Sequence, residues 1–298
     1  MDVSEFRPQR QLLVPPGEIE LFARDMTATI ATDVPLATIQ ATLAEVGQWL
    51  PVDGDPTLAV GRLVEMNSTG PLRLGYGAWR DLLLGCQFTN GRGELITAGG
   101  RAVKNVAGYD LTKLMVGQQG ELGAINTITT RTYRRPDGAI LARFEPEVRV
   151  LNRLLATAIR PQWAMLTSSD LLCGYLGDAA SLDFWYDALQ RWPEPAPREV
   201  VRRTLAEDMA ERARIFRWPA GELAFRASVP PMRIAAFVER AGLNQWAADA
   251  AFGIVVGVMA DAGRIREAAA AVGGTVVGEA LGSRTSALLE RVKLAFRS

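Results

Sequence analysis

The residues best suited to bind a ligand gather in one glycine-rich stretch, residues 99–125. Asp110 is placed to cap a short predicted helix over 111–116 within this stretch. The glycines fall at the ends of two predicted strands that flank the helix: Gly99, Gly100, Gly120 and Gly123. Glycine lets the backbone come close to other backbone, or to a ligand that carries phosphates or a flat ring. The stretch therefore predicts either a tight chain connection or a ligand cradle.

The 298-residue chain contains no histidine, and this absence restricts its chemistry. A histidine general base, a Ser-His-Asp triad, a histidine-ligated metal and a flavin attached through histidine are all excluded. Cys86 and Cys173 are the two cysteines, too few for a disulfide framework or for an iron–sulfur cluster held by this chain alone. Any redox chemistry must come from a cofactor, assisted by Asp, Glu, Lys, Arg or Tyr side chains.

The glycine-rich stretch also carries a family resemblance. KNVAGYDLTKL (104–114), followed by GELGAI (120–125), resembles the FAD-binding domain of the vanillyl-alcohol-oxidase-type (PCMH) flavoproteins. Within that group the sequence is similar to the E subunit of glycolate oxidase. The resemblance continues upstream through residues 67–85 and covers roughly residues 26–136. A motif of this length is more specific than a lone GxGxxG.

The resemblance implies a flavin held between two subdomains, and this sequence departs from the pattern in the first. The family's pyrophosphate loop, PxGGG followed by Ser or Thr, has no counterpart, and residues 1–25 contain one glycine, Gly17. The family's TIGG turn falls on residues 59–62, where Gly61 is kept and Arg62 replaces the second glycine. Arg62 either pairs with a phosphate or fills the empty site. Losing three charge-assisted hydrogen bonds would weaken binding by roughly 4–9 kcal/mol. FAD is thus the expected cofactor, bound weakly or lost.

The resemblance assigns cofactor-binding roles by position. The candidates are Gly61, Arg62, Asn67, Ser68, Thr69, Gly70, Gly99, Gly100, Lys104, Asn105, Gly120, Gly123, Ala124 and Ile125. Each group has a structural alternative. Gly99-Gly100 and Lys104-Asn105 are equally read as a tight strand-to-loop connection, and 67–70 as an ordinary polar turn. Arg73, Arg80 and Asp81 either steer an anionic substrate or form structural ion pairs, and the structural pair is favoured for Arg80-Asp81. Arg226 either projects onto a carboxylate substrate from the second domain or lies at a strand edge, and the edge position is favoured.

The elements that would position these residues form a truncated FAD-binding domain over 1–136 in an α+β protein. Residues 1–25 are predicted irregular, followed by a strand over 26–34 and a helix over 35–50. Residues 82–100 predict a β-hairpin with Asn90-Gly91 in its turn. A strand over 124–133 follows the short helix. Pro136 and Asp137-Gly138 mark the predicted domain boundary.

Residues 137–298 predict a second domain of ferredoxin-like βαββαβ character, with helices on one face of an antiparallel sheet. A proline-rich hinge over 192–199 separates two similar runs of strands and helices. The predicted helices cover 147–158, 179–191, 200–216, 231–241, 261–272 and 284–296.

Lys plus Arg equals Asp plus Glu at 33 each, so charge gives no indication of a nucleic-acid or membrane-surface partner. No apolar run spans a bilayer, and the N-terminus lacks the apolar core of a signal peptide. The expected location is the cytoplasm.

The resemblance implies an FAD-linked oxidoreductase subunit of a glycolate oxidase-like complex that acts on a small 2-hydroxy acid. Its expected partners are a second FAD subunit and an iron–sulfur subunit. The alternative, favoured by the missing pyrophosphate loop and by Arg62, is a flavin-poor structural subunit of the same kind of complex.

Overall fold

The computed structural model describes residues 12–100, 111–215, 224–258 and 261–277. By their internal contacts, the described residues form two compact units. Unit 1 contains residues 12–69 and 76–135, and unit 2 contains residues 70–75 and 136–277. That the units are separately folding domains with the limits 1–136 and 137–298 stays a prediction.

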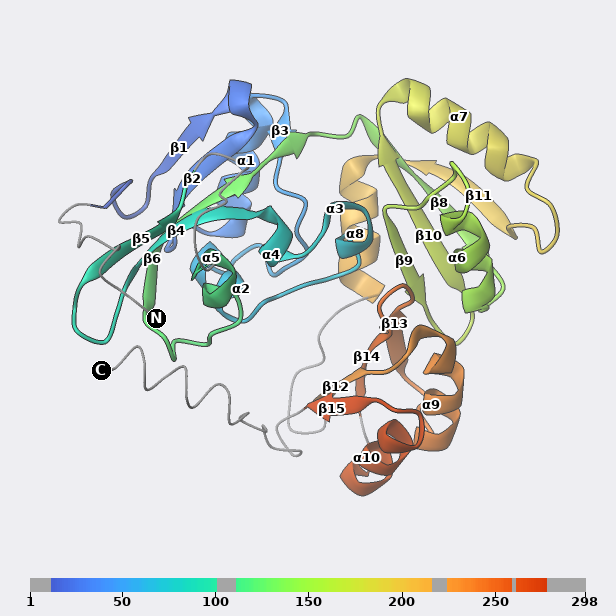
Figure 1. Cartoon of the computed structure of the whole chain (residues 1–298). Coiled ribbons are helices and arrows are strands. Elements are labelled where there is room, and N and C mark those ends of the chain that lie inside the picture. Colours follow the sequence, from blue (N-terminus) through green and yellow to red (C-terminus); the bar gives the residue numbers. More distant parts are fainter. Residues whose placement is uncertain (1–11, 101–110, 216–223, 259–260, 278–298) are drawn as a thin grey trace. The chain divides into compact units, whose positions relative to one another are not determined.

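Unit 1 is built on a five-stranded antiparallel sheet in the order β1-β2-β6-β4-β5 (Figure 1). Its strands are β1 (Ile19–Phe22), β2 (Thr27–Ala31), β4 (Leu83–Thr89), β5 (Leu95–Gly99) and β6 (Ala124–Arg131). Its helices are α1 (Leu36–Glu45), α2 (Val60–Glu65), α4 (Trp79–Leu82) and α5 (Leu111–Met115). A separate two-stranded ribbon pairs β3 (Gln48–Trp49) with β7 (Tyr133–Arg134).

The strands of unit 1 alternate between an apolar and a polar face. Ala28 and Ile30 of β2 join a core with Phe88, Ile128 and the buried side of the helices. Thr29 points to the opposite face and bonds Thr129 across the sheet at 3.0 Å. On the same face Gln87 donates to Thr97 at 2.9 Å and accepts from Thr127 at 3.4 Å. These side chains stay satisfied although they are buried, as buried polar groups must be.

Unit 2 contains two ferredoxin-like halves in one eight-stranded sheet, which confirms the predicted ferredoxin-like character but not every predicted element. The first half has the order β11-β8-β10-β9 and the second the order β13-β14-β12-β15. The first comprises β8 (Gly138–Phe144), α6 (Val148–Leu155), β9 (Trp163–Leu166), β10 (Leu171–Gly177), α7 (Ala179–Gln190) and β11 (Glu199–Arg203). The second comprises β12 (Ala224–Ser228), α9 (Ile234–Ala241), β13 (Trp246–Asp249), β14 (Ile254–Val258), α10 (Ala262–Ala271) and β15 (Thr275–Val277).

A charged helix, α8 (Leu205–Ile215), follows the first half and carries a buried ion pair. Asp208 and Arg212 are 1% and 4% exposed, with Arg212 Nε 2.9 Å from Asp208 Oδ2. The other oxygen of Asp208 accepts the indole N–H of Trp163 at 2.9 Å. One carboxylate therefore fastens α8 to strand β9.

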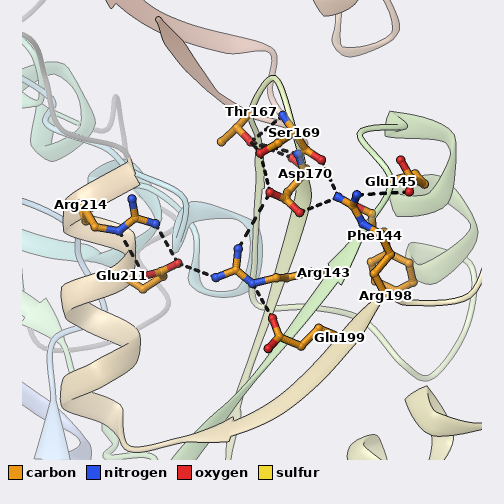
Figure 2. A network of polar contacts seen from close by, with 10 residues as sticks. All are labelled: Arg143, Phe144, Glu145, Thr167, Ser169, Asp170, Arg198, Glu199, Glu211 and Arg214. Atoms are coloured by element: carbon orange, nitrogen blue, oxygen red, sulfur yellow. Dashed lines mark hydrogen bonds and ion pairs between the residues drawn. The ribbon is translucent and has the colours of Figure 1, made fainter.

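A second polar network joins α8 to strands β8 and β11 (Figure 2). Arg143 of β8 pairs with Glu199 of β11 at 2.8 Å and with Glu211 of α8 at 3.1 Å. Arg214 also binds Glu211, and Arg198 binds Asp170 at 2.6 Å. Each member has partners within the network, so we interpret it as structural.

Several predicted element limits are wrong. Residues 19–22, predicted irregular, form β1, and the helix predicted over 35–50 ends at Glu45. Two short helices that were not predicted, α3 (Arg73–Tyr76) and α4, begin within residues 71–81. Residues 199–203, assigned mostly to a helix, form β11, while β13 was not predicted. The helix predicted over 284–296 and the Asp110 cap lie outside the described residues. Within the described part of the chain, each helix is too short or too polar to cross a bilayer.

Candidate functional site

A pocket of about 410 Å³ opens in unit 1 beside the second half of the glycine-rich stretch. The turn of the β4–β5 hairpin forms one side of it, and the loop that enters β6 forms the other. Glu65, the last residue of α2, lies at its wall. The lining residues are Glu65, Thr89, Asn90, Gly91, Gly120, Glu121, Leu122, Gly123 and Ala124.

The hairpin side of the pocket is fixed by Asn90. Its carboxamide oxygen accepts the backbone N–H groups of Arg92 and Glu94, and its nitrogen donates to the Glu94 carboxylate at 2.8 Å. Gly93 adopts the left-handed region at φ 78°. The predicted Asn90-Gly91 turn is therefore confirmed, and it runs from Asn90 to Glu94.

The other side of the pocket is fixed by Gln118, which sequence reasoning missed. Its side chain is 3% exposed and bridges its own loop. The amide oxygen accepts the N–H of Leu122 at 2.8 Å, and the amide nitrogen donates to the carbonyl of Gly123 at 2.9 Å. The sequence carries no signal for this role, because the burial of Gln118 and its two hydrogen bonds exist only in the folded loop.

Two of the three glycines that line the pocket, Gly120 and Gly123, have different surroundings. Gly123 has φ 147°, and a Cβ there would overlap the carbonyl oxygen of Thr89. Gly120 has φ 80° and is exposed, with no atom within 4 Å of the position a Cβ would take. Backbone packing explains Gly123, whereas Gly120 faces open space. Of the next two candidates, Ala124 is exposed in the pocket and Ile125 is buried in the core at 6% exposure.

The candidates on and after α2 have structural partners. Gly61 lies against Thr32, where a Cβ would stand 2.5 Å from the threonine Cβ, and its N–H donates to the Thr32 carbonyl. Arg62 is exposed and reaches Glu65 at 4.0 Å. Thr32 also donates to the Ile125 carbonyl at 2.8 Å, so it ties α2 to the start of β6.

Asn67 terminates α2 in a Schellman motif. It adopts φ 48°, its N–H donates to Val64, and the N–H of Ser68 donates to Leu63. The Val64 carbonyl also accepts the N–H of Gly117, which joins α2 to the loop that lines the pocket. The side-chain oxygen of Asn67 is buried and has no partner in the structure. Asn67 and Ser68 are therefore helix-terminating residues beside the pocket rather than part of its lining.

The remaining candidates lie away from the pocket lining or cannot be placed. A Cβ on Gly99 would overlap the Leu84 carbonyl, which also accepts the N–H of Gly100 at 3.1 Å. This geometry supports the structural alternative for Gly99, whereas no atom lies within 4 Å of the position that a Cβ would take at Gly100. Thr69 is partly buried, and Gly70 belongs to the segment grouped with unit 2. Lys104 and Asn105 lie outside the described residues.

The charges of the side chains that line the pocket determine which part of FAD could bind there. Glu65 and Glu121 supply two carboxylates, and among the described residues that line it none is cationic. Carboxylate and carbonyl oxygens accept hydrogen bonds, so the pocket fits the amine and hydroxyl groups of the adenosine part. The described lining residues offer no positive side chain to a diphosphate. The open face of Gly120 leaves room for a ligand to touch the backbone.

Several known proteins are similar in sequence to part of this chain. Glycolate oxidase subunit GlcE of Escherichia coli is 37% identical over 133 residues, which cover 43% of this chain and 38% of that protein. The mitochondrial D-lactate dehydrogenase (cytochrome) of Arabidopsis thaliana is 30% identical over 122 residues, 41% of this chain and 22% of that protein. The chain thus matches less than half the length of these curated relatives.

The solved structures add evidence for the fold. An alkyldihydroxyacetonephosphate synthase has a TM-score of 0.59 over 92% of this chain and 62% of its own, at 13% identity. Residues 17–99 match the FAD binding domain family. This chain therefore carries, over residues 17–99, an FAD binding domain of the PCMH type.

Proposed function

We propose that this chain is an FAD-linked oxidoreductase subunit of a glycolate oxidase-like complex that acts on a small 2-hydroxy acid. The observation that carries the proposal is the pocket beside Gly120, in a unit that contains an FAD binding domain. Relatives named as glycolate oxidase subunits support it, GlcE of Escherichia coli and GlcD of Bacillus subtilis. The proposed partners are a second FAD subunit and an iron–sulfur subunit, and the proposed location is the cytoplasm.

The chain's own residues supply binding and orientation. Bound FAD would provide the redox chemistry, accepting a hydride from the carbon that carries the substrate hydroxyl. In this proposal Glu65 and Glu121, which line the pocket, accept hydrogen bonds from the adenosine hydroxyls and amine. No histidine of this chain takes the hydroxyl proton of the substrate, because the sequence contains none.

A second function is favoured by the same pocket. Its lining holds two carboxylates and no cation among the described residues, and Arg62 lies beside Glu65. A subunit without its own diphosphate contacts would keep the fold to hold a complex together. This flavin-poor structural subunit is the alternative.

The visible spectrum separates the two functions. The full chain is purified alone and together with its co-purifying partners, and flavin absorbance is measured per chain. Near-stoichiometric flavin in the lone chain supports the oxidoreductase subunit and contradicts the structural one. A colourless chain that still assembles with its partners supports the structural subunit and contradicts the oxidoreductase subunit.

A pocket-filling variant then locates the flavin. Ala124 is exposed at the first position of β6, so Ala124→Phe fills the pocket without entering the core. We expect flavin content to fall while the melting temperature stays unchanged. Thr38→Phe, at an exposed site on α1, is the matched control. Full flavin occupancy in Ala124→Phe would place the cofactor elsewhere.

A further inference from the structure

The eight-stranded sheet of unit 2 ends at β11 on one side and at β15 on the other. Strand β12 pairs with both β14 and β15, so it is an interior strand and the edge position predicted for Arg226 is wrong. Strand β11 pairs along one edge with β8, and no other strand of the described residues pairs with its second edge (Figure 1). An edge of this kind offers backbone N–H and C=O groups to another strand.

The sequence of β11, EVVRR, is complementary in charge to a second copy of itself. In an antiparallel pair of two β11 strands centred on Val201, Glu199 of each copy stands opposite Arg203 of the other. Opposite charges at directly opposed positions stabilise an antiparallel pair, and like charges there destabilise it. The strand contains no proline, and its register with β8 is regular, so neither of these common obstacles to edge pairing is present in β11.

The charged ends of β11 lie on one face of the sheet, because residues four apart in a strand share a face. Glu199 stands opposite Arg143 of β8 and binds its Nε at 2.8 Å through Oε2. The side chain remains 49% exposed, so its other oxygen can accept a further bond. Arg203 stands opposite Ala139, which has no polar side chain, and its Nε atom has no hydrogen-bond partner within the described part of the chain. Both ends of the strand therefore have capacity for a partner from another chain.

We infer that β11 is a docking edge for a second copy of this chain, and that the two copies join by antiparallel pairing of β11 centred on Val201. The pairing makes one continuous sheet from two eight-stranded sheets. It places a pair of opposite charges at each end and two valines at the centre. A contact of five residues from each copy is small, so the dimer is weak and depends on concentration. This inference does not rest on the proposed function.

Two charge-reversal variants test the register, because each alone destroys the charge match and the two together restore it. Two copies of Glu199→Arg place arginine opposite arginine, and two copies of Arg203→Glu place glutamate opposite glutamate. Sedimentation of the full chain measures the dissociation constant of the dimer. We expect the constant to rise at least about tenfold in each variant alone and to return to the native value in an equimolar mixture of the two. Arg233→Glu makes the same charge change at an exposed site of unit 2 and should leave the constant unchanged.

A cross-link tests the same register at the centre of the pair. Residue 201 of one copy lies directly opposite residue 201 of the other, with Cα atoms about 4.5–5.5 Å apart, within the range of a disulfide. Val201→Cys should therefore form a covalent dimer under mild oxidation. Cys86 and Cys173 are buried and should not contribute. Arg202→Cys is the control, because its two copies are displaced by about 6.6 Å along the strands and should link far less.

The inference is overturned by a native chain that stays monomeric at sub-millimolar concentration. It is also overturned by a dimer that neither charge reversal weakens, or by two folded variants whose mixture does not recover the native dissociation constant. Melting temperatures show whether each variant is folded. If Glu199→Arg does not fold because its new charge faces Arg143, the cross-link decides, and equal linking of Val201→Cys and Arg202→Cys contradicts the register.

Discussion

The backbone of Gly123 lies directly against the carbonyl oxygen of Thr89, the residue that precedes the hairpin turn of the pocket. Gly123→Ala should therefore disturb the fold before it disturbs any ligand. Its φ of 147° is open to glycine and strained for alanine. We expect the free energy of unfolding to fall by at least about 2 kcal/mol, measured by urea denaturation. Gly93→Ala has φ 78° with open space around it, so a loss of about 1 kcal/mol is expected. Equal losses would contradict this interpretation.

Asn67 should tolerate glycine and reject valine. Its left-handed φ of 48° ends α2, and glycine adopts that conformation without a Cβ penalty. Asn67→Gly should change the free energy of unfolding by less than about 0.5 kcal/mol, whereas Asn67→Val should lower it by about 1–2 kcal/mol. Any flavin occupancy should survive in Asn67→Gly. If Asn67→Gly stays folded but loses its flavin, the cofactor-binding role that the resemblance assigns to Asn67 is supported instead.

The buried pair in α8 should be strongly coupled. Asp208→Asn removes the negative charge beside Arg212, which is 4% exposed, and should lower the free energy of unfolding by about 3–5 kcal/mol. Arg212→Met should cost a similar amount, and the double variant less than the sum. Asp187 and Arg191 provide the matched control, because they have the same spacing at 66% and 81% exposure. Breaking that pair should change stability by under about 1 kcal/mol. Additive losses at the buried pair would exclude coupling.

The Glu211 network predicts a loss of stability in acid. Burial alone raises the pKa of Glu211, but the hydrogen bond from Arg214 and the charges of Arg214, Arg143 and Arg203 outweigh it and hold the pKa below its ordinary 4.5. The stabilisation is therefore complete above about pH 4.5 and is lost as the pH falls through the lower folded-state pKa. Denaturant midpoints between pH 7 and pH 3 should fall less steeply in Glu211→Gln than in the native chain. Parallel curves would show that Glu211 titrates normally.

The sequence predicts elements that local chemistry specifies. The helix predicted over 111–116 is α5, and the two runs of strands and helices after Pro136 each close as a ferredoxin-like half. The prediction from the sequence fails where a segment becomes a strand because it pairs with another strand. Residues 19–22 form a four-residue strand by pairing with β2, and 246–249 form β13 between β9 and β14. Likewise 199–203 become a strand on the edge of β8.

The sequence predicts where the candidate site lies, but it does not show why each of its glycines is required. A glycine indicates that another group comes close to the backbone at that position. The residue type does not say whether that group is other backbone or a ligand. Thr32, Leu84 and Thr89 fill the space beside Gly61, Gly99 and Gly123, and Gly120 alone of the pocket glycines named by the motif is open. Gln118 was missed because its role depends on two hydrogen bonds that exist only after the loop has closed.

The join between the two ferredoxin-like halves has a mechanical consequence. Strands β8 and β10 pair over seven residues, whereas β9 and β13 pair over two, with one more backbone bond from Ala250 to Ala164. Separation of the two half-sheets between β9 and β13 would break few backbone hydrogen bonds. Each half-sheet would keep its own helices. Under force or in mild denaturant, unit 2 should separate first between β9 and β13. Amide protons that bond across these two strands should therefore exchange faster than those within either half.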